Sequence, residues 1–182
     1  MALVLGTNCG FVLAAPSADP ASTAENIDTE ASAIKDTAPT GALNVIEIGW
    51  WCDNATEEAN FEVALYTHNV GDNNPEAVIG SISTTNAKGT GSGWKRVTGL
   101  NIPITAGTIY WIGLQLDDTA TATATNKGTG AGQKWDTKWT ETALTDPWGA
   151  SDGTQEQLVS IYAVYEEAAA DSDMNVIGEN IY

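Results

Sequence analysis

The sequence predicts an all-β protein, an antiparallel β-sandwich, on three observations. Short runs rich in β-branched and aromatic residues recur along the chain, Gly- and Pro-containing turns separate them, and no segment has the periodicity of an amphipathic helix. The chain has 182 residues, the length of one ordinary domain, and 42% of them are hydrophobic. That composition is sufficient for a sizeable core without disulfide staples.

Residues 1–40 are rich in Ala, Ser, Thr, Pro and Asp and predict an extended N-terminal arm. Residues 31–37 predict one strand within this arm. Ile27, Ala31 and Ile34 also have the spacing of a short helix, and the pattern does not separate the two.

Residues 41–166 predict the β-sandwich domain itself. Its expected strands are residues 43–52, 61–67, 77–83, 94–98, 100–104, 108–116 and 158–165. Two of them, 108–116 and 158–165, are almost continuously apolar, which is typical of central strands covered on both faces. Residues 117–131 predict a polar loop, and residues 134–139 predict a weakly paired edge.

The charge balance is strongly acidic, with 24 Asp and Glu against 7 Lys and Arg and a formal net charge of −17. Such a chain repels phosphate, so we expect neither nucleic-acid binding nor attachment to an anionic membrane. No uninterrupted apolar run reaches the 18 or so residues of a membrane helix. A neutral or basic partner, or a cation, is the kind that this charge favours.

Residues 1–16 only partly resemble a signal peptide, because they contain no basic residue and because Thr7, Asn8 and Gly10 interrupt the apolar run. We therefore expect synthesis and folding in a reducing cytosol. Cys9 and Cys52 could form one bridge, but two small buried hydrophobic residues are the favoured interpretation.

No catalytic arrangement stands out, so we do not expect an enzyme. The single histidine, His68, is expected in an exposed loop, and no nucleophile elbow, Cys-His zinc spacing or phosphate-binding loop is found. Paired carboxylates such as Asp117 and Asp118 are common in so acidic a chain and point to opposite faces of a strand. They are therefore expected to be solvated surface groups.

No cofactor is expected, although calcium remains open at two loops. Calcium binds six to eight oxygen atoms from carboxylates, amides and carbonyls. The sequence gathers such groups in two places: Asp53, Asn54, Glu57 and Glu58 in one loop, and Asp72, Asn73 and Asn74 in another. Neither loop has the EF-hand spacing.

Seven tryptophans are many for this length, and their environments differ. Trp111 and one of the neighbours Trp50 and Trp51 are expected in the core. Trp135, Trp139 and Trp148 lie in a polar region, where exposed rings could form a ligand platform by stacking on sugars or could anchor a protein interface. The alternative is that they plug the open end of the sandwich.

The C-terminal tail, residues 167–182, joins an acidic spacer to a short apolar segment. The apolar residues are Met174, Val176, Ile177, Ile181 and Tyr182. Two interpretations stay open: a frayed chain end, or an assembly arm whose apolar residues form an interface with a neighbouring subunit.

The middle of the chain runs FEVALYTH, a turn with Pro75, AVIGSIS, a lone Trp94 and then AGTIYWIGLQLDD. This order, within residues 43–165, resembles a pattern of jelly-roll sandwiches in extracellular and carbohydrate-binding-like domains. The whole chain resembles phage virion proteins that decorate a capsid or project from it. The resemblance to a style of protein, without a sequence-specific motif, implies an architecture more strongly than a function.

The resemblance implies a structural virion protein, made in the host cytoplasm and located on the capsid surface as a cement or decoration subunit. Its expected partners are the major capsid protein or another virion protein, and further copies of itself in a homo-oligomer, with a trimer favoured. The alternative is a carbohydrate-binding module or adhesin-like tip domain that uses the tryptophan platform.

Overall fold

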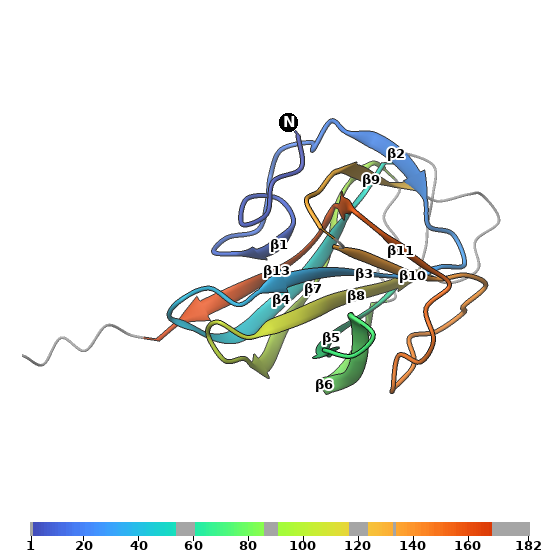
Figure 1. Cartoon of the computed structure of the whole chain (residues 1–182). Coiled ribbons are helices and arrows are strands. Elements are labelled where there is room, and N and C mark those ends of the chain that lie inside the picture. The colour runs from blue at the N-terminus through green and yellow to red at the C-terminus, as the bar shows by residue number, and fades with distance from the viewer. Residues whose placement is uncertain (1, 54–60, 86–90, 117–123, 133, 169–182) are drawn as a thin grey trace, which may run out of the picture.

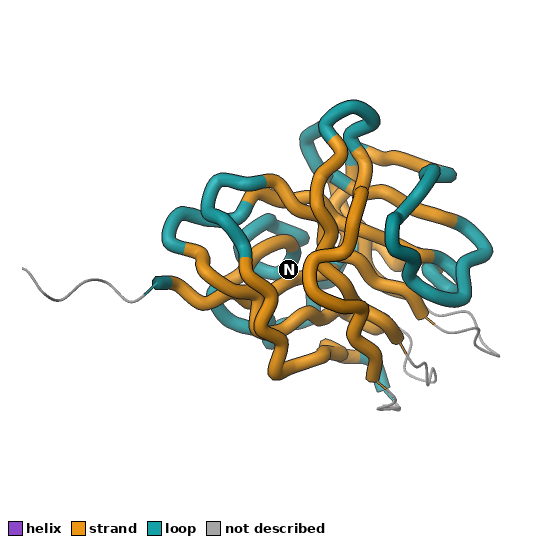
Figure 2. Tube along the Cα trace, turned by 90° about the horizontal axis from the view of Figure 1, so that it is seen from below, coloured by secondary structure: helices purple, strands orange, loops and turns teal. Residues whose placement is uncertain are grey.

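The computed structural model describes residues 2–53, 61–85, 91–116, 124–132 and 134–168, and the regular structure in these ranges is all β-strand (Figures 1 and 2). The strands are β1 (Gly10–Val12), β2 (Thr23–Asn26), β3 (Ala31–Thr37), β4 (Ala42–Cys52), β5 (Phe61–Asn69), β6 (Asn74–Thr85), β7 (Gly93–Pro103), β8 (Ile109–Leu116), β9 (Ala124–Thr129), β10 (Trp135–Lys138), β11 (Gly153–Gln155), β12 (Gln157–Val159) and β13 (Ile161–Glu167). The predicted all-β class is confirmed. None of the described residues belongs to a helix with the length and apolarity to cross a membrane.

Two large sheets enclose the main hydrophobic core. One has the strand order β1-β13-β4-β7 and the other the order β11-β10-β3-β8-β5-β6, while β12-β9-β2 form a smaller third sheet. All neighbouring strands in these sheets are antiparallel except β1 and β13, which are parallel. Ile48 and Trp50 of β4 meet Leu65 of β5 and Ile112 of β8 in one buried cluster, so the arrangement is sandwich-like.

The two almost continuously apolar segments are central strands, as predicted. Strand β8 lies between β3 and β5, and β13 lies between β1 and β4. Residues 158–165 are not one strand, however, because the chain changes sheets at Ser160. The hydroxyl of this buried residue lies 2.8 Å from Thr125 Oγ1 and accepts a hydrogen bond from the amide of Asn126.

Part of the predicted N-terminal arm, residues 1–40, packs into the body of the fold. Phe11, Ile27 and Ile34 are at most 1% exposed. Strand β3 lies inside the six-stranded sheet between β8 and β10, which decides between strand and helix for residues 31–37. The composition suggested an arm because Ala and Ser are weak strand formers, but small side chains suit a strand that is covered on both faces.

Three other expectations change in detail. The two short strands expected at residues 94–98 and 100–104 are one strand, β7 (Gly93–Pro103), with Gly99 in the left-handed region at φ +75° in place of a break. The polar loop after β8 contains β9, and the edge expected at residues 134–139 contains β10 (Trp135–Lys138), an interior strand. Cross-strand pairing overrode local polarity in both segments.

Two glycines let aromatic rings lie flat on the sheets. A Cβ atom at Gly49 would lie 2.6 Å from the Tyr162 hydroxyl oxygen and 2.6 Å from the Lys95 carbonyl oxygen. A Cβ atom at Gly113 would lie 2.8 Å from Cε2 of Tyr66. Tyr66 belongs to a second apolar cluster on the outer face of the six-stranded sheet, with Trp111, Leu144 and Trp148.

Cys9 and Cys52 are both buried thiols, in agreement with the favoured interpretation of two small hydrophobic residues. Burial, and then the negative charge of Asp36, raise the pKa of the Cys9 thiol to about 12. Both cysteines therefore pack as part of the main core.

Candidate functional site

Residues 139–152, which we call the covering segment, fold over the outer face of the six-stranded sheet. The ring of Trp148 packs edge-on against Tyr66, with ring centroids 5.2 Å apart and planes at 80°. The backbone amide of Trp148 donates a 2.7 Å hydrogen bond to the Glu76 carbonyl, and the Tyr66 hydroxyl donates a 3.0 Å hydrogen bond to the Thr145 carbonyl. The segment is therefore attached to β5 and β6 by both apolar and polar contacts.

A buried carboxylate anchors the same segment to β10. Asp136 is fully buried and accepts hydrogen bonds from Trp148 Nε1 at 2.9 Å and from the Ser151 hydroxyl at 2.8 Å. Burial raises the pKa of Asp136 to about 6, although these two hydrogen bonds act in the opposite direction. The neighbouring Trp135 points the other way, into the main core, as alternation along a strand requires.

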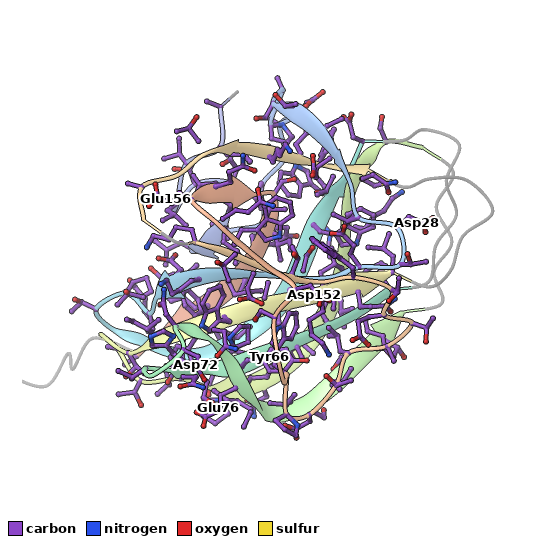
Figure 3. All side chains as sticks on the ribbon, turned by 45° about the vertical axis from the view of Figure 1, so that its right-hand side comes forward. Asp28, Tyr66, Asp72, Glu76, Asp152 and Glu156 are labelled. Carbon is purple, nitrogen blue, oxygen red and sulfur yellow. The ribbon has the colours of Figure 1, made fainter. Side chains whose placement is uncertain are left out.

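A cavity of about 580 Å³ lies between the β5–β6 hairpin and this covering segment. Its lining comes from two stretches of chain far apart in sequence: Asn69, Asp72, Asn74, Pro75 and Glu76 on one side, and Pro147, Gly149, Ala150, Ser151 and Thr154 on the other. Asp72 and Glu76 lie close together at the lower left of Figure 3, to the left of Tyr66.

The lining is rich in hydrogen-bond acceptors. It includes the carboxylates of Asp72 and Glu76, and none of the described lining residues is Lys, Arg or His. Asn74 is only 8% exposed, and its Oδ1 has no hydrogen-bond partner among the described residues. Pro75, Pro147 and Ala150 supply apolar surface, so the cavity suits a ligand that offers hydrogen-bond donors together with a carbon skeleton.

The three tryptophans of the expected platform are not brought together on the surface. Trp135 and Trp148 are each 1% exposed, so neither can stack on a ligand: Trp135 packs in the main core, and Trp148 packs in the outer cluster with Tyr66. Trp139 is 55% exposed and lies against Gly153 at the edge of the covering segment. A platform of three rings is therefore wrong, and one ring remains available.

His68 lies in strand β5 and not in an exposed loop. Its Nδ1 accepts a 3.0 Å hydrogen bond from Nε1 of the fully buried Trp111. Burial, and then the nearby Lys35, lower the pKa of His68. This ring nitrogen contacts an indole and not a hydroxyl or thiol, so the geometry gives it a packing role.

The calcium loops are only partly covered by the structure. Asp53 accepts a 3.2 Å hydrogen bond from Trp51 Nε1, while Asn54, Glu57 and Glu58 lie outside the described residues. In the second loop, Asn73 accepts a 2.5 Å bond from Lys35 Nζ. Within the described ranges, no three or more His, Cys, Asp or Glu residues are grouped to hold a metal ion.

A second, more apolar groove of about 550 Å³ lies beside the other side of the hairpin. Its lining is Thr67, His68, Val70, Ile79, Pro103, Gly107, Thr108, Ile109 and Tyr110. Val70 is 85% exposed and Ile109 is 37% exposed. We call this surface the Val70 groove.

The described chain ends at the same end of the molecule as the Val70 groove. The amide of Ala168 donates to the carbonyl of Gly41, and Ala38 in the same turn exchanges hydrogen bonds with Gly107 and Thr108. The expected interface residues Met174, Val176, Ile177, Ile181 and Tyr182 follow this point and lie outside the described residues.

The sequence did not single out Asp136, Glu76, Pro147 or Ser151. The one signal was an acidic residue inside a strand, next to Trp135, which is unusual because unpaired charges are rarely buried.

Compared with protein-family models, curated proteins and solved structures, the chain matches none of them.

Proposed function

We propose that this chain is a structural virion protein, a capsid cement or decoration subunit with a jelly-roll body. The observation that carries the proposal is the position of the Val70 groove beside the end of β13, from which an apolar C-terminal segment continues. Successive strands that alternate between the two large sheets, as from β3 to β4 to β5, support the jelly-roll assignment.

In this proposal the C-terminal segment of one copy docks in the Val70 groove of the next copy. Val70 and Ile109 offer exposed apolar surface, and the five apolar residues between 174 and 182 offer the complementary surface. Fourteen extended residues span at most about 48 Å, which is enough to reach a neighbouring subunit. A head-to-tail contact of this kind closes into a ring, for which a trimer is the expected size.

The charge suits a subunit on the outside of a particle. A net charge of −17 repels other particles and favours basic or neutral surfaces of the major capsid protein as partner. Lys95 and Arg96 on β7, an edge strand of the four-stranded sheet, oppose uncontrolled pairing at that edge.

Light scattering on the full chain and on a chain truncated after Ala168 tests the assembly step. The full chain should have three times the monomer mass of 19.0 kDa, and the truncated chain should be monomeric. Val70→Asp should also give a monomer, whereas Leu13→Asp, at a 61% exposed residue outside the groove, should not. A monomeric full chain contradicts self-assembly.

The virion location needs a separate experiment. Particles purified from a host culture that carries the gene should contain the chain in a fixed ratio to the major capsid protein, measured by mass spectrometry. Gold-labelled antibody against the chain should decorate intact capsids. Purified particles without the chain would contradict the proposal even if the protein self-assembles.

A further inference from the structure

We propose that the cavity between the β5–β6 hairpin and the covering segment is a binding site for a neutral saccharide. The cavity is separate from the Val70 groove, and the inference does not rest on a virion role. None of Trp135, Trp139 and Trp148 lines it, so it also differs from the tryptophan platform expected from the sequence.

The size and attachment of the walls suit a small ligand. A volume of about 580 Å³ lies within the range of about 300 to 1,000 Å³ typical of small-molecule sites. Two hydrogen bonds join the hairpin wall to the covering segment. The Trp148 amide donates one to the Glu76 carbonyl, and the Val78 amide donates the other, of 3.0 Å, to Asp146 Oδ1. A site formed before the ligand arrives loses less conformational entropy on binding.

Hydrogen bonds to buried residues fix the side of the cavity that contains Ser151. Ser151 donates to the buried Asp136, and the Asn74 amide nitrogen lies 3.4 Å from both the Ser151 hydroxyl oxygen and the Gly149 carbonyl oxygen. These contacts connect β6, β10 and the covering segment at one place. The hydrogen bond to Asp136 therefore holds Ser151 in the lining before any ligand binds.

The polar lining calls for a ligand with many hydrogen-bond donors. Asp72 and Glu76 accept and do not donate when ionised. The Asn74 Oδ1, in a side chain more than nine-tenths buried, is an acceptor that the described protein leaves unpaired. An unmade hydrogen bond of this kind is costly, and a ligand hydroxyl reached by rotation of the amide would satisfy it.

The same lining argues against other ligand classes. An anion would meet Asp72 and Glu76 with no cationic side chain among the described lining residues. A lone metal ion would leave most of the cavity unfilled and would not use its apolar surface. A sugar ring presents hydroxyl groups at its edge and C–H groups on its faces, which match the carboxylates and the surfaces of Pro75, Pro147 and Ala150.

Saturation-transfer NMR and calorimetry on the full chain test the site. The probes are glucose, galactose, mannose, rhamnose and N-acetylglucosamine, each as the monosaccharide and as short oligomers. At least one probe should bind to the native protein. Calcium chloride and methylamine serve as comparison ligands, because binding of only these cations would indicate a cation site in place of a saccharide site.

Two matched variants locate the binding. Ala150→Trp places a large ring in the lining at an exposed residue and should abolish the saccharide signal. Ala143→Trp makes the same change at an exposed residue of the same covering segment outside the lining, and binding should stay unchanged. Glu76→Gln keeps the shape but removes a charged acceptor, and should weaken binding about tenfold or more.

The outcomes separate clearly. Loss of binding in Ala150→Trp with retention in Ala143→Trp supports the proposal. It is overturned if no probe saccharide binds, if Ala150→Trp binds as well as the native chain, or if only calcium or methylamine binds. Thermal melting of each variant shows that a loss of signal is not a loss of fold, and Glu76→Gln provides the test should Ala150→Trp fail to fold.

Discussion

The indole Nε1 of Trp148 donates a 2.9 Å hydrogen bond to Oδ1 of Asp136, at a place where Asp136 is fully buried and Trp148 is 1% exposed. This bond joins the covering segment to strand β10. Ser151, in the same segment, donates to the other oxygen of this carboxyl group, so Asp136 accepts both hydrogen bonds. The wall of the cavity is thus attached to a group that resists ionisation.

Asp136 should contribute a fall in the free energy of unfolding as pH rises from about 4 to about 6, and Asp136→Asn should remove this contribution. Burial raises the pKa of Asp136 from 3.8 to about 6, so within this window the native state keeps a proton that the unfolded chain has lost. The native state is therefore favoured at the acidic end. Urea unfolding at several pH values measures the slope.

Glu30 also contributes to the pH dependence of the free energy of unfolding, and its contribution extends to higher pH. Its pKa is raised to about 7, first by burial and then by the charge of Glu25. Glu30→Gln should leave the Asp136 part of the slope in place and remove the decline nearest neutral pH. An unchanged slope in Asp136→Asn would show that this carboxyl group titrates normally in the native state.

His68→Ala should destabilise the protein. The substitution leaves the Nε1 group of the fully buried Trp111 without its acceptor, which costs about 1 to 3 kcal/mol. His68→Asn, which can place an amide oxygen near the position of Nδ1, should recover part of the loss. Equal stability of the alanine variant and the native protein would contradict this role.

The His68 imidazole should titrate below its ordinary pKa of 6.5, because burial and Lys35 both disfavour its charged form. The unfolded chain then takes up a proton before the native state does, so this residue lowers stability as pH falls below about 6.5. NMR titration of the imidazole resonances measures the pKa directly. A value above 6.5 would contradict the described surroundings of the ring.

Gly49→Ala should cost about 2 kcal/mol or more, because the new methyl group would overlap Tyr162 and the Lys95 carbonyl. Gly71→Ala is the matched control. Its new Cβ would lie 3.4 Å from the Asn69 side-chain oxygen in an exposed turn, and the effect should stay within about 0.5 kcal/mol. Urea midpoints of the two variants give the comparison, and similar values would contradict the close approach of Tyr162 to Gly49.

Both thiols should resist modification in the native state. Cys9 and Cys52 are buried thiols, and the raised pKa of Cys9 keeps it protonated at neutral pH. An aromatic disulfide reagent should therefore react with two thiols in denaturant and with almost none under native conditions. Rapid native labelling of either thiol would show that the core around it is open.

The class of the fold could be predicted from local pattern, and its pairings could not. Segments with dense apolar and β-branched residues, such as β8, identify themselves as central strands. Strands β3 and β10 carry small or polar residues, so the sequence predicts a strand in an arm and a weakly paired edge, whereas both lie inside the six-stranded sheet. The break at Ser160 likewise depends on Thr125 and Asn126, which are far away in sequence.

The candidate site was even less accessible to sequence reasoning. Asn74 attracted notice as an oxygen ligand, but its companions Ser151 and Pro147 lie on a segment more than seventy positions away. Trp135 and Trp148 sit in a polar stretch of sequence and yet are buried, since each packs against residues from other strands. Neighbours in sequence could not reveal that both are covered.

The position of β13 between β1 and β4 sets the order in which the chain can fold during synthesis (Figure 1). The first strand has no partner in its sheet until the last strand has left the ribosome, so the four-stranded sheet closes only after residue 167 is made. Until then the edges of β1 and β4 that pair with β13 have no partner strand. Unpaired strand edges can pair with other chains, so unfinished chains of this protein are more prone to aggregate than the completed one.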